Sequence, residues 1–358
     1  YGTSYSVLAA SVLESALGSD FGISESPGFM KSAEFYLQTV APSGQYFNFA
    51  DSDGSINGRS IVLLSWFAAH TGDALFFKRE FFEHPENAGR FAGPGLIWLA
   101  QFKPQKRSKL ASSWHGQGAN PVAVFRGEGE NQDGFYLAAK GGKANLSHGN
   151  MDAGTFVFEL DGVRWVIDPG NQRYYLLNKI GFNLAGHCQE CPRWTLLTKK
   201  NQAHNTITVN NARFDVSAKA RITDFQKKPL PGVTVDMSPL YFDNLDVLRR
   251  KVIKESNRSV LIEDRFETNQ LTQNITWGLM TRADVVPSSN GAVLKQDGKE
   301  LKITILEPEG IEFSIISLDP PPLKIDKTIE NLKRLELRIP VWTVMENQGG
   351  LKVRLSGD

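Results

Sequence analysis

The first hundred residues carry apolar side chains at helical spacing. One apolar stripe runs from Val7 to Leu17 and stops at Gly18, a residue that commonly ends a helix. The same spacing predicts further helices over residues 29–40, 57–68, 75–82 and 95–102. Short helices joined by short loops are typical of helical hairpins packed side by side. The N-terminal part of the chain is therefore predicted to be helical.

Beyond residue 109 the apolar pattern becomes that of short strands. The runs 155–160 and 163–167 flank Asp161-Gly162, a two-residue hairpin sequence whose turn positions both need positive φ. Asp297-Gly298 predicts a second hairpin, and Ser256-Asn257-Arg258 separates the strands of a third. Many short strands without helices between them predict an antiparallel β-sandwich.

A basic, proline-containing segment at 103–109 separates the two patterns. Its charges suit a solvated linker, so we place the domain boundary there. The predicted fold class is multidomain α+β, with a helical domain over residues 1–105 and an antiparallel β-sandwich over residues 106–358.

The composition excludes some classes of partner. Hydrophobic residues make up 41% of the chain and charged residues 22%, a mixture that can bury a sizeable core. Lys and Arg (40) nearly balance Asp and Glu (39), which argues against nucleic-acid or membrane-surface binding, although a local basic cleft could still bind a polyanion. No apolar run approaches the roughly 18 residues of a membrane span. Because the sequence opens at Tyr1 rather than Met, we expect a fragment that lacks an N-terminal part and any export signal.

The chain has two cysteines, Cys188 and Cys191, in a Cys-x-x-Cys arrangement beside His187. Such a pair can be half a zinc site, a redox pair or two structural thiols. A zinc ribbon would need a second pair, and a thioredoxin-like site would need a βαβ context. The sequence has neither, which favours a structural or incidental role.

Three polar residues stand at the ends of predicted strands. His148 lies just before the 155–167 hairpin, Asp168 ends its second strand, and His204 precedes the strand-like run 206–209. Side chains at strand ends can meet at one edge of a sheet, where this trio would suit a metal or catalytic site. On spacing alone, unrelated turn residues are the favoured interpretation.

The residues around this trio resemble the signature of heparinase II/III-like polysaccharide lyases. The matching motifs are Ser147-His148-Gly149-x-x-Asp152-Ala153-Gly154-x-Phe156, Gly162-x-x-Trp165-x-x-Asp168-x-Gly170 and Ala203-His204-Asn205-Thr206. The segments 1–5, 16–22 and 47–51 resemble the helical portion of bacterial members. The resemblance implies an incomplete α/α toroid of helical hairpins followed by the β-sandwich. It also implies a bacterial enzyme that is periplasmic or secreted.

The family's chemistry implies roles for several residues. Removing the proton at C5 of a uronate requires neutralisation of the adjacent carboxylate, a base for the proton and an acid for the leaving oxygen. In the family, a toroid tyrosine and the first His of the motif do this proton work. The resemblance places these roles on His148 and on Tyr5 or Tyr1, with Tyr5 preferred because it begins the amphipathic stretch. The residue that neutralises the carboxylate is expected upstream of this chain.

The implied metal site departs from the family pattern. Zinc-binding members have His-Gly-His, and their zinc supports the sandwich and the catalytic loop rather than activating water. Asp168 and His204 match the later ligands, whereas Asn150 replaces the second His. An amide oxygen is a poor zinc ligand but suits a hard cation such as Ca²⁺. Three hypotheses follow: weakly held Zn²⁺, another divalent cation, or no metal with these side chains joined by hydrogen bonds.

Other residues are candidates for substrate contact. Arg173 and Tyr174 follow the Asp168 motif, Trp194 could stack on a sugar, and His115 could line a cleft between the domains.

The predicted function is a lyase cleaving uronic-acid-containing polysaccharides, of the heparin, heparan sulfate or alginate type, by β-elimination. The alternative is a glycan-binding β-sandwich that has lost lyase activity. A metal-dependent hydrolase would need a third strong ligand that the sequence does not show.

Overall fold

The structure is a computed structural model that describes residues 2–54, 58–78, 89–129, 134–341, 344 and 346–357. The chain divides into two compact units. The helical unit comprises residues 1–40, 44–46 and 55–111, and the sheet unit comprises residues 41–43, 47–54 and 112–358. The sheet unit thus begins six residues after the predicted boundary and also takes in 41–43 and 47–54, which the sequence pattern assigned to the helical domain.

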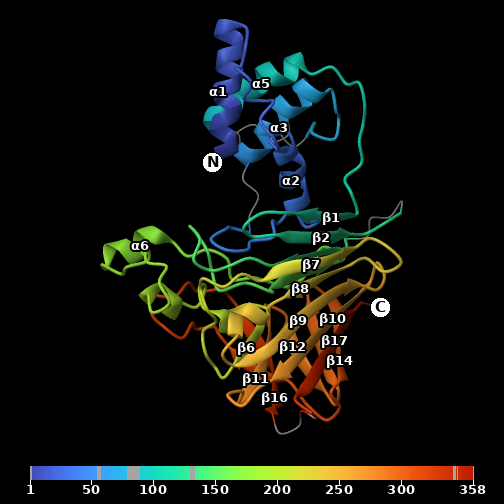
Figure 1. The fold of residues 1–358 in the computed structure, drawn as a ribbon. Coiled ribbons are helices and arrows are strands. Elements are labelled where there is room, and N and C mark those ends of the chain that lie inside the picture. Colours follow the sequence, from blue (N-terminus) through green and yellow to red (C-terminus); the bar gives the residue numbers. More distant parts are fainter. Residues whose placement is uncertain are drawn as a thin grey trace. The chain divides into compact units, whose positions relative to one another are not determined.

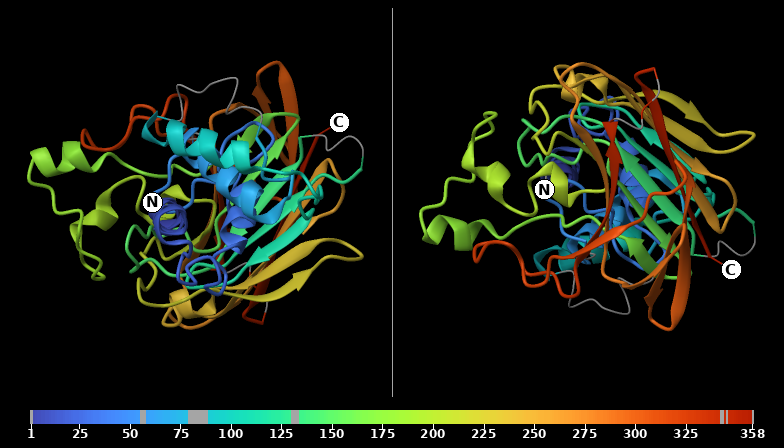
Figure 2. Two further views of the ribbon diagram at one scale, coloured as in Figure 1. Left: turned by 90° about the horizontal axis from the view of Figure 1, so that it is seen from above. Right: turned by 90° about the horizontal axis from the view of Figure 1, so that it is seen from below.

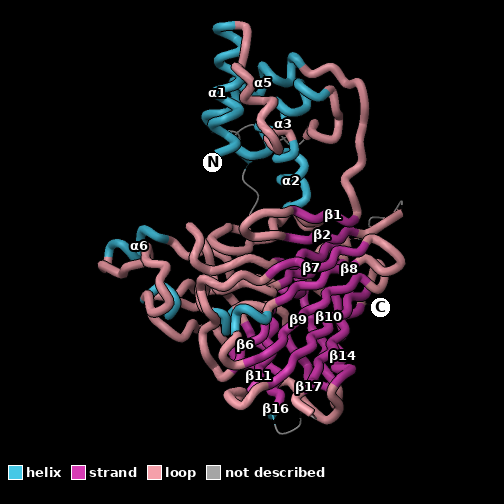
Figure 3. The backbone as a smooth tube through the Cα atoms, viewed as in Figure 1, coloured by secondary structure: helices cyan, strands magenta, loops and turns pink. Residues whose placement is uncertain are grey.

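Helices make up most of the regular structure in the helical unit (Figure 3). They are α1 (Gly2–Leu17), α2 (Lys31–Thr39), α3 (Gly58–Thr71) and α5 (Ala92–Gln101). Gly18 and Gly72, with φ of 76° and 64°, follow α1 and α3 as helix stops. Trp66, Phe67 and Trp98 are central to the apolar core of this unit. Membership of these helices in an α/α toroid stays a prediction.

The helix predicted over 75–82 is wrong in its described part, because residues 75–78 are turn and coil. Asp73 explains the difference. One oxygen of its buried carboxylate accepts hydrogen bonds from the backbone N–H groups of Leu75 and Ser108, both at 3.0 Å. The chain after α3 is therefore held in a turn against the segment 106–108, and a new helix does not start there. Residues 79–82 lie outside the described part of the chain.

The sheet unit contains three antiparallel sheets in the residues that the structure describes (Figures 1 and 2). The five-stranded sheet has the order β1 (Ser113–Gly116), β2 (Val122–Arg126), β3 (Tyr136–Lys140), β4 (Phe156–Leu160), β5 (Val163–Val166). The eight-stranded sheet has the order β12 (Asp284–Ser288), β13 (Gly291–Gln296), β14 (Lys299–Glu307), β17 (Gln348–Ser356), β10 (Ser259–Thr268), β9 (Leu245–Lys254), β8 (Gly232–Asp236), β7 (Arg221–Gln226). The four-stranded sheet has the order β15 (Ser314–Ser317), β16 (Lys333–Pro340), β11 (Asn274–Thr281), β6 (Ile207–Val209). The prediction of antiparallel β-structure is confirmed.

The three predicted hairpins are present. Asp161 and Gly162 join β4 to β5 with φ of 55° and 79°, and Asp297 and Gly298 join β13 to β14 with φ of 52° and 71°. β9 and β10 form the third pair around residues 256–258. Positive φ at both central residues is the geometry that Asp-Gly favours, which is why these turns were readable from the sequence.

Strands β3, β4 and β5 of the five-stranded sheet are buried on both faces, unlike the alternating strands β9 and β10. Successive residues of a strand point to opposite faces. Leu137 therefore enters the large core shared with the other two sheets, whereas its neighbour Tyr136 packs in a smaller cluster with Phe47 and Phe49. This second cluster fixes the segment 47–54 on the sheet and so determines where Asp51 lies.

The remaining short helices lie in the loops of the sheet unit. They are α6 (Tyr174–Lys179) and the 3₁₀-helices Pro192–Thr195, Asn201–Ala203 and Ser238–Tyr241. None of the helices in the described ranges is long and apolar enough to cross a membrane.

Candidate active site

His148 projects from a tight loop that precedes β4. Its backbone has φ of 61°, and its side chain is 68% exposed. The loop is closed by Gly149, where an added Cβ would lie 2.1 Å from the carbonyl oxygen of Ala144. The backbone N–H of Asp51 donates to the carbonyl of His148 at 3.1 Å. The loop therefore rests on the segment 47–54 and presents the imidazole to solvent.

The carboxylate of Asp51 orients the His148 ring. Asp51 is nearly fully buried, and its Oδ2 lies 3.3 Å from His148 Nδ1 and accepts a hydrogen bond from the Tyr174 hydroxyl. Tyr174 Oη is itself 3.2 Å from His148 Nδ1. Because an ionised carboxylate can only accept, Nδ1 carries the proton of the neutral ring. Nε2 is left with a lone pair, as a general base requires.

Lys199 neutralises the buried Asp51 carboxylate. Its ammonium, which is fully buried, donates to Asp51 Oδ1 and, at 2.9 Å, to Asn150 Oδ1. Burial lowers the pKa of the Lys199 ammonium, and the neighbouring Asp51 carboxylate opposes that shift. The Lys199 carbonyl accepts a hydrogen bond from Met151 N at 2.9 Å, so backbone and side chain both contact the His148 loop.

Arg193 supports the same loop from another side. Its Nη2 donates to the Gly149 carbonyl at 2.7 Å, and its Nη1 donates to His187 Nε2 at 2.7 Å. Burial, together with the Arg193 charge, lowers the pKa of His187, so this imidazole stays neutral and accepts the hydrogen bond. Cys188 and Cys191 form a disulfide in the loop between His187 and Arg193, which gives the two cysteines a structural role.

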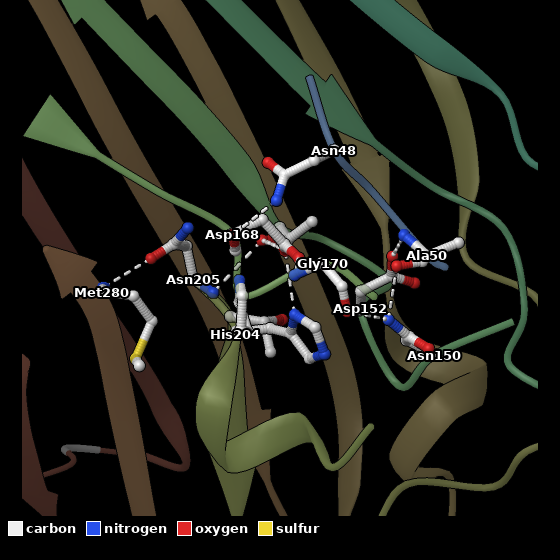
Figure 4. A network of polar contacts seen from close by, with 12 residues as sticks. Asn48, Ala50, Asn150, Asp152, Asp168, Gly170, His204, Asn205 and Met280 are labelled. Atoms are coloured by element: carbon white, nitrogen blue, oxygen red, sulfur yellow. Dashed lines mark hydrogen bonds and ion pairs between the residues drawn. The ribbon is translucent and has the colours of Figure 1, made fainter. Parts of the chain in front are cut away.

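Asp168 and His204 form a buried pair (Figure 4). Asp168 Oδ2 accepts from His204 Nδ1 at 2.9 Å, and its Oδ1 accepts from Gly170 N at 3.0 Å. Asn150 donates to the carbonyls of Ala50, at 2.7 Å, and Gly170, at 3.4 Å. Asn150 is therefore joined to the Asp168–His204 pair through Gly170, in one network of polar contacts.

These three side chains do not fit a divalent cation as they lie. Asn150 Oδ1 faces the Lys199 ammonium, a positive charge that would repel a metal ion. His204 Nδ1 is turned to Asp168, so its buried Nε2, which has no hydrogen-bond partner, lies on the other side of the ring from that carboxylate. In this arrangement a single ion could not contact both His204 Nε2 and the Asp168 carboxylate. In the described part of the chain, no three His, Cys, Asp or Glu side chains form a group that could hold a metal.

The remaining candidate residues are described within their own units. Tyr5 lies on α1 in the helical unit, 47% exposed, and its hydroxyl accepts a hydrogen bond from Arg90 at 2.7 Å. Tyr1 lies outside the described residues. Arg173 is exposed at the start of α6, next to Tyr174, which directly contacts His148. Of the predicted substrate residues, Tyr174 thus contacts His148 itself, and Arg173 is its neighbour in the sequence.

The structure contradicts the predicted sugar contact of Trp194 and describes the surroundings of His115. The Trp194 indole is fully buried, with its N–H donating to the Cys188 carbonyl at 2.7 Å and Arg193 lying 4.8 Å from the ring centre. It cannot stack on a sugar. His115 belongs to β1, and its ring centre lies 5.3 Å from that of Phe225. Its buried Nε2 has no hydrogen-bond partner in the described structure, and a role of His115 in substrate contact stays a prediction.

The sequence analysis missed Asp51 and Lys199. Asp51 stood in a segment noted for its family resemblance but was not given a role. Lys199 carried no signal, because a lysine in a polar run is usually exposed. The two residues are 148 positions apart, and only the folded chain brings them together. A polar residue directly after the Phe47–Ala50 run was the one available hint for Asp51.

The fold and the His148 site together define a class of protein. It is an antiparallel β-sheet protein with a candidate acid–base histidine, oriented by a buried carboxylate, on a loop over one sheet. A family model described as "Heparinase II/III-like, C-terminal" matches residues 122–329, and the chain belongs to this family. The resemblance stated from the motifs is thereby confirmed.

Solved structures share the fold at low sequence identity. Heparan sulfate lyase HepC from Pedobacter heparinus matches with a TM-score of 0.65 and 16% identity, over 99% of this chain and 51% of that chain. A heparinase III gene product matches with a TM-score of 0.61 and 16% identity, over 98% and 50%. A further heparinase III structure matches with a TM-score of 0.63 and 12% identity, over 99% and 53%. This chain therefore spans about half the length of these proteins. A comparison with curated proteins found no match.

Proposed function

We propose that this chain is part of a polysaccharide lyase that cleaves a uronic-acid-containing polysaccharide by β-elimination. The observation that carries the proposal is the His148 site. An exposed imidazole lies with Nδ1 against a buried carboxylate, which leaves Nε2 as a base toward solvent. The solved structures with this fold include a heparan sulfate lyase, so heparan sulfate and heparin are the first substrates to test, with alginate as the other type.

The proposed reaction uses the residues of this chain for proton transfer. His148 Nε2 takes the proton from C5 of the uronate, the C4–O bond to the leaving sugar breaks, and a C4–C5 double bond forms. A tyrosine hydroxyl, assigned to Tyr5 or Tyr1 by family resemblance, protonates the leaving oxygen. No water is added. Asp51 stabilises the imidazolium that His148 becomes, in the way that a buried carboxylate supports a catalytic histidine.

The surroundings of the site support an acidic polysaccharide as the partner. Arg173 is exposed beside Tyr174, and a guanidinium suits bidentate contacts with carboxylate or sulfate groups. The Cys188–Cys191 disulfide supports a periplasmic or secreted location, because disulfides persist in oxidising compartments.

The products distinguish this proposal from its alternatives. The intact protein that contains this chain is incubated with heparan sulfate, heparin, alginate and hyaluronan, and ultraviolet absorbance of an unsaturated uronate is followed. A lyase produces rising absorbance and fragments lighter by one water than those of hydrolysis. Retention of a polysaccharide without either change would establish the glycan-binding alternative, which the replacement of the metal-site His by Asn150 favours. Fragments carrying an added water would identify a hydrolase.

A further inference from the structure

Lys199 is one of three buried cations that contact the His148 loop and the residues after it; Arg193 donates to the Gly149 carbonyl, and Lys140 pairs with Asp152. Lys199 Nζ donates to Asn150 Oδ1 at 2.9 Å within the loop and to Asp51 Oδ1 outside it. The Lys199 carbonyl accepts from Met151 N. Lys199 thus adds a charged link between the loop that carries His148 and the segment that carries the orienting carboxylate, beside the hydrogen bonds from Asp51 N to the His148 carbonyl and from Asn150 to the Ala50 carbonyl. Asp152 adds a second buried carboxylate whose charge favours the ammonium.

This ammonium contacts Asn150, one of the three predicted ligands of the family's metal. Asn150 occupies the position where zinc-binding members have a histidine, and its oxygen faces Lys199 instead of a metal. The residues at the other two positions, Asp168 and His204, form a hydrogen bond with each other. The Asn150 oxygen therefore faces a fixed positive charge, and the three side chains do not converge in the way that the donors of a divalent ion must.

We propose that the Lys199 ammonium is the resident cation of this site, that it takes the place of a divalent metal ion, and that it positions His148 through Asp51 and Asn150. Lys199 is a positioning residue, because its ammonium is buried and contacts the two residues that support His148 rather than solvent. The link to catalysis rests on the proposed function. The cation role itself does not, since it concerns only the organisation of the loop.

The geometry also explains why a lysine suffices here. A tetrahedral ammonium donates up to three hydrogen bonds, and two of them go to Asp51 and Asn150. A metal in the same position would have to displace that ammonium and leave it buried without a partner. Burying an unpaired charge is costly, so metal binding and the Lys199 contacts exclude each other.

The first arm of the test needs no substitution. Purified protein is exposed to Zn²⁺ or Ca²⁺, dialysed, and its metal content measured, and its melting temperature is recorded with and without a chelator. We expect no retained divalent ion and an unchanged melting temperature. Retention of about one ion per chain, together with a lower melting temperature after chelation, would overturn the proposal.

The second arm follows amide hydrogen exchange in peptides covering residues 147–152 and 48–52. Lys199→Met should speed exchange in both peptides by about tenfold or more, because the loop loses its charged hydrogen bonds. Lys199→Gln keeps a donor and should show a smaller increase, which protects the test if Lys199→Met does not fold. Added Zn²⁺ should restore neither variant.

Lys254 provides a matched control. It is a buried lysine of β9 whose ammonium donates to the Arg126 carbonyl at 2.8 Å. Lys254→Met should leave exchange in the two peptides at the wild-type rate. Equal effects of both substitutions, or an unchanged rate in Lys199→Met and Lys199→Gln, would contradict the positioning role. Because none of these readouts uses a substrate, the proposal can hold or fail independently of lyase activity.

Discussion

At the scale of single residues, the site depends on a few side chains whose orientation is fixed by hydrogen bonds to their neighbours. Asp51 accepts from Tyr174 and Lys199 and lies beside His148, so its buried carboxylate has partners on each oxygen. A buried carboxylate without such partners would be neutralised by protonation. The exposed His148 thus owes its tautomer to groups that the solvent does not reach.

Gly170 is predicted to be irreplaceable for a steric reason. Its φ is 65°, and an added Cβ would lie 2.5 Å from Asn48 Nδ2 and 2.7 Å from the Ser52 carbonyl oxygen. Gly170→Ala should lower the free energy of unfolding by about 2–5 kcal/mol, from left-handed backbone strain plus the clash.

Gly162 separates the two contributions. Its φ is 79°, yet an added Cβ there meets nothing within 4 Å. Gly162→Ala should cost only the backbone strain, about 1–2 kcal/mol. Denaturant unfolding of both variants measures the difference, and equal losses would show that the Asn48 and Ser52 contacts do not constrain Gly170.

His115 should make stability depend on pH. Burial lowers the pKa of its imidazole below the ordinary value of about 6.5. The unfolded chain therefore binds the proton more readily, and the stability that His115 contributes is present above about pH 6.5 and lost as the pH falls through that value toward its folded pKa. His115→Phe should reduce the fall in melting temperature between about pH 7.5 and about pH 5.5. An identical fall in variant and wild type would rule this out.

Residue types alone could not decide several of these roles. The motif around His148 was readable because its residues are close in sequence. Trp194 was read as a sugar-stacking residue, but whether an indole is buried depends on the tertiary packing around it. The Asp51–Lys199 pair was out of reach for the same reason, since it joins distant parts of the chain.

At the scale of elements, a buried ion pair connects the eight-stranded sheet to the loops of the site. Arg250 on β9 and Asp264 on β10 are cross-strand partners with two hydrogen bonds, at 2.7 and 2.8 Å. Arg250 Nη1 also donates to the carbonyls of Gly154 and Asn205, at 2.8 and 2.6 Å. The guanidinium thus fixes the residues that follow the His148 loop and His204.

Arg250→Met is predicted to destabilise the fold by about 3–5 kcal/mol, because it leaves the buried Asp264 carboxylate unpaired. Adding Asp264→Leu should recover part of the loss, since the uncompensated charge is then removed. Denaturant unfolding of the single and double variants measures both effects.

The neighbouring exposed pair gives the control for this prediction. Arg265 and Glu307, 2.6 Å apart, have side chains that are 45% and 35% exposed. Arg265→Met should cost no more than about 1 kcal/mol, because solvent screens the pair. A loss as large as that of Arg250→Met would contradict the role given to burial.

Helices and strands marked by adjacent residues could be predicted from the sequence. Those whose structure depends on contacts between distant residues could not. The Asp-Gly hairpins follow from the φ preferences of two adjacent residues. The helix expected over 75–82 is absent in its described part, because the Asp73 carboxylate accepts a hydrogen bond from the backbone N–H of Ser108, a residue 35 positions away. The segment 47–54 joined the sheet unit because Phe47 and Phe49 pack on the five-stranded sheet.

At the scale of the whole molecule, the apolar periodicity changes from helical to strand-like spacing near residue 109, and the sheet unit takes up the chain from residue 112. That unit also contains residues 41–43 and 47–54, which the periodicity alone assigned to the helical domain. The family was predictable from the sequence because its motifs are short runs of neighbouring residues. The fold joins those motifs in one network, from Asn150 through Gly170 to Asp168 and His204. The metal assignment was not readable in the same way, because it depended on where the Asn150 oxygen points. That direction is set by Lys199.

The measurement that tests the central claim most directly compares the initial rates of wild type and His148→Ala on the best substrate of the polysaccharide panel. The side chain is mostly exposed, so the variant should keep the melting temperature of the wild type. The rate of formation of the unsaturated product is predicted to fall by about 10²–10⁴-fold, the usual contribution of a general acid–base group. A folded His148→Ala variant that forms the same unsaturated product at the wild-type rate would contradict the assignment of proton transfer to His148.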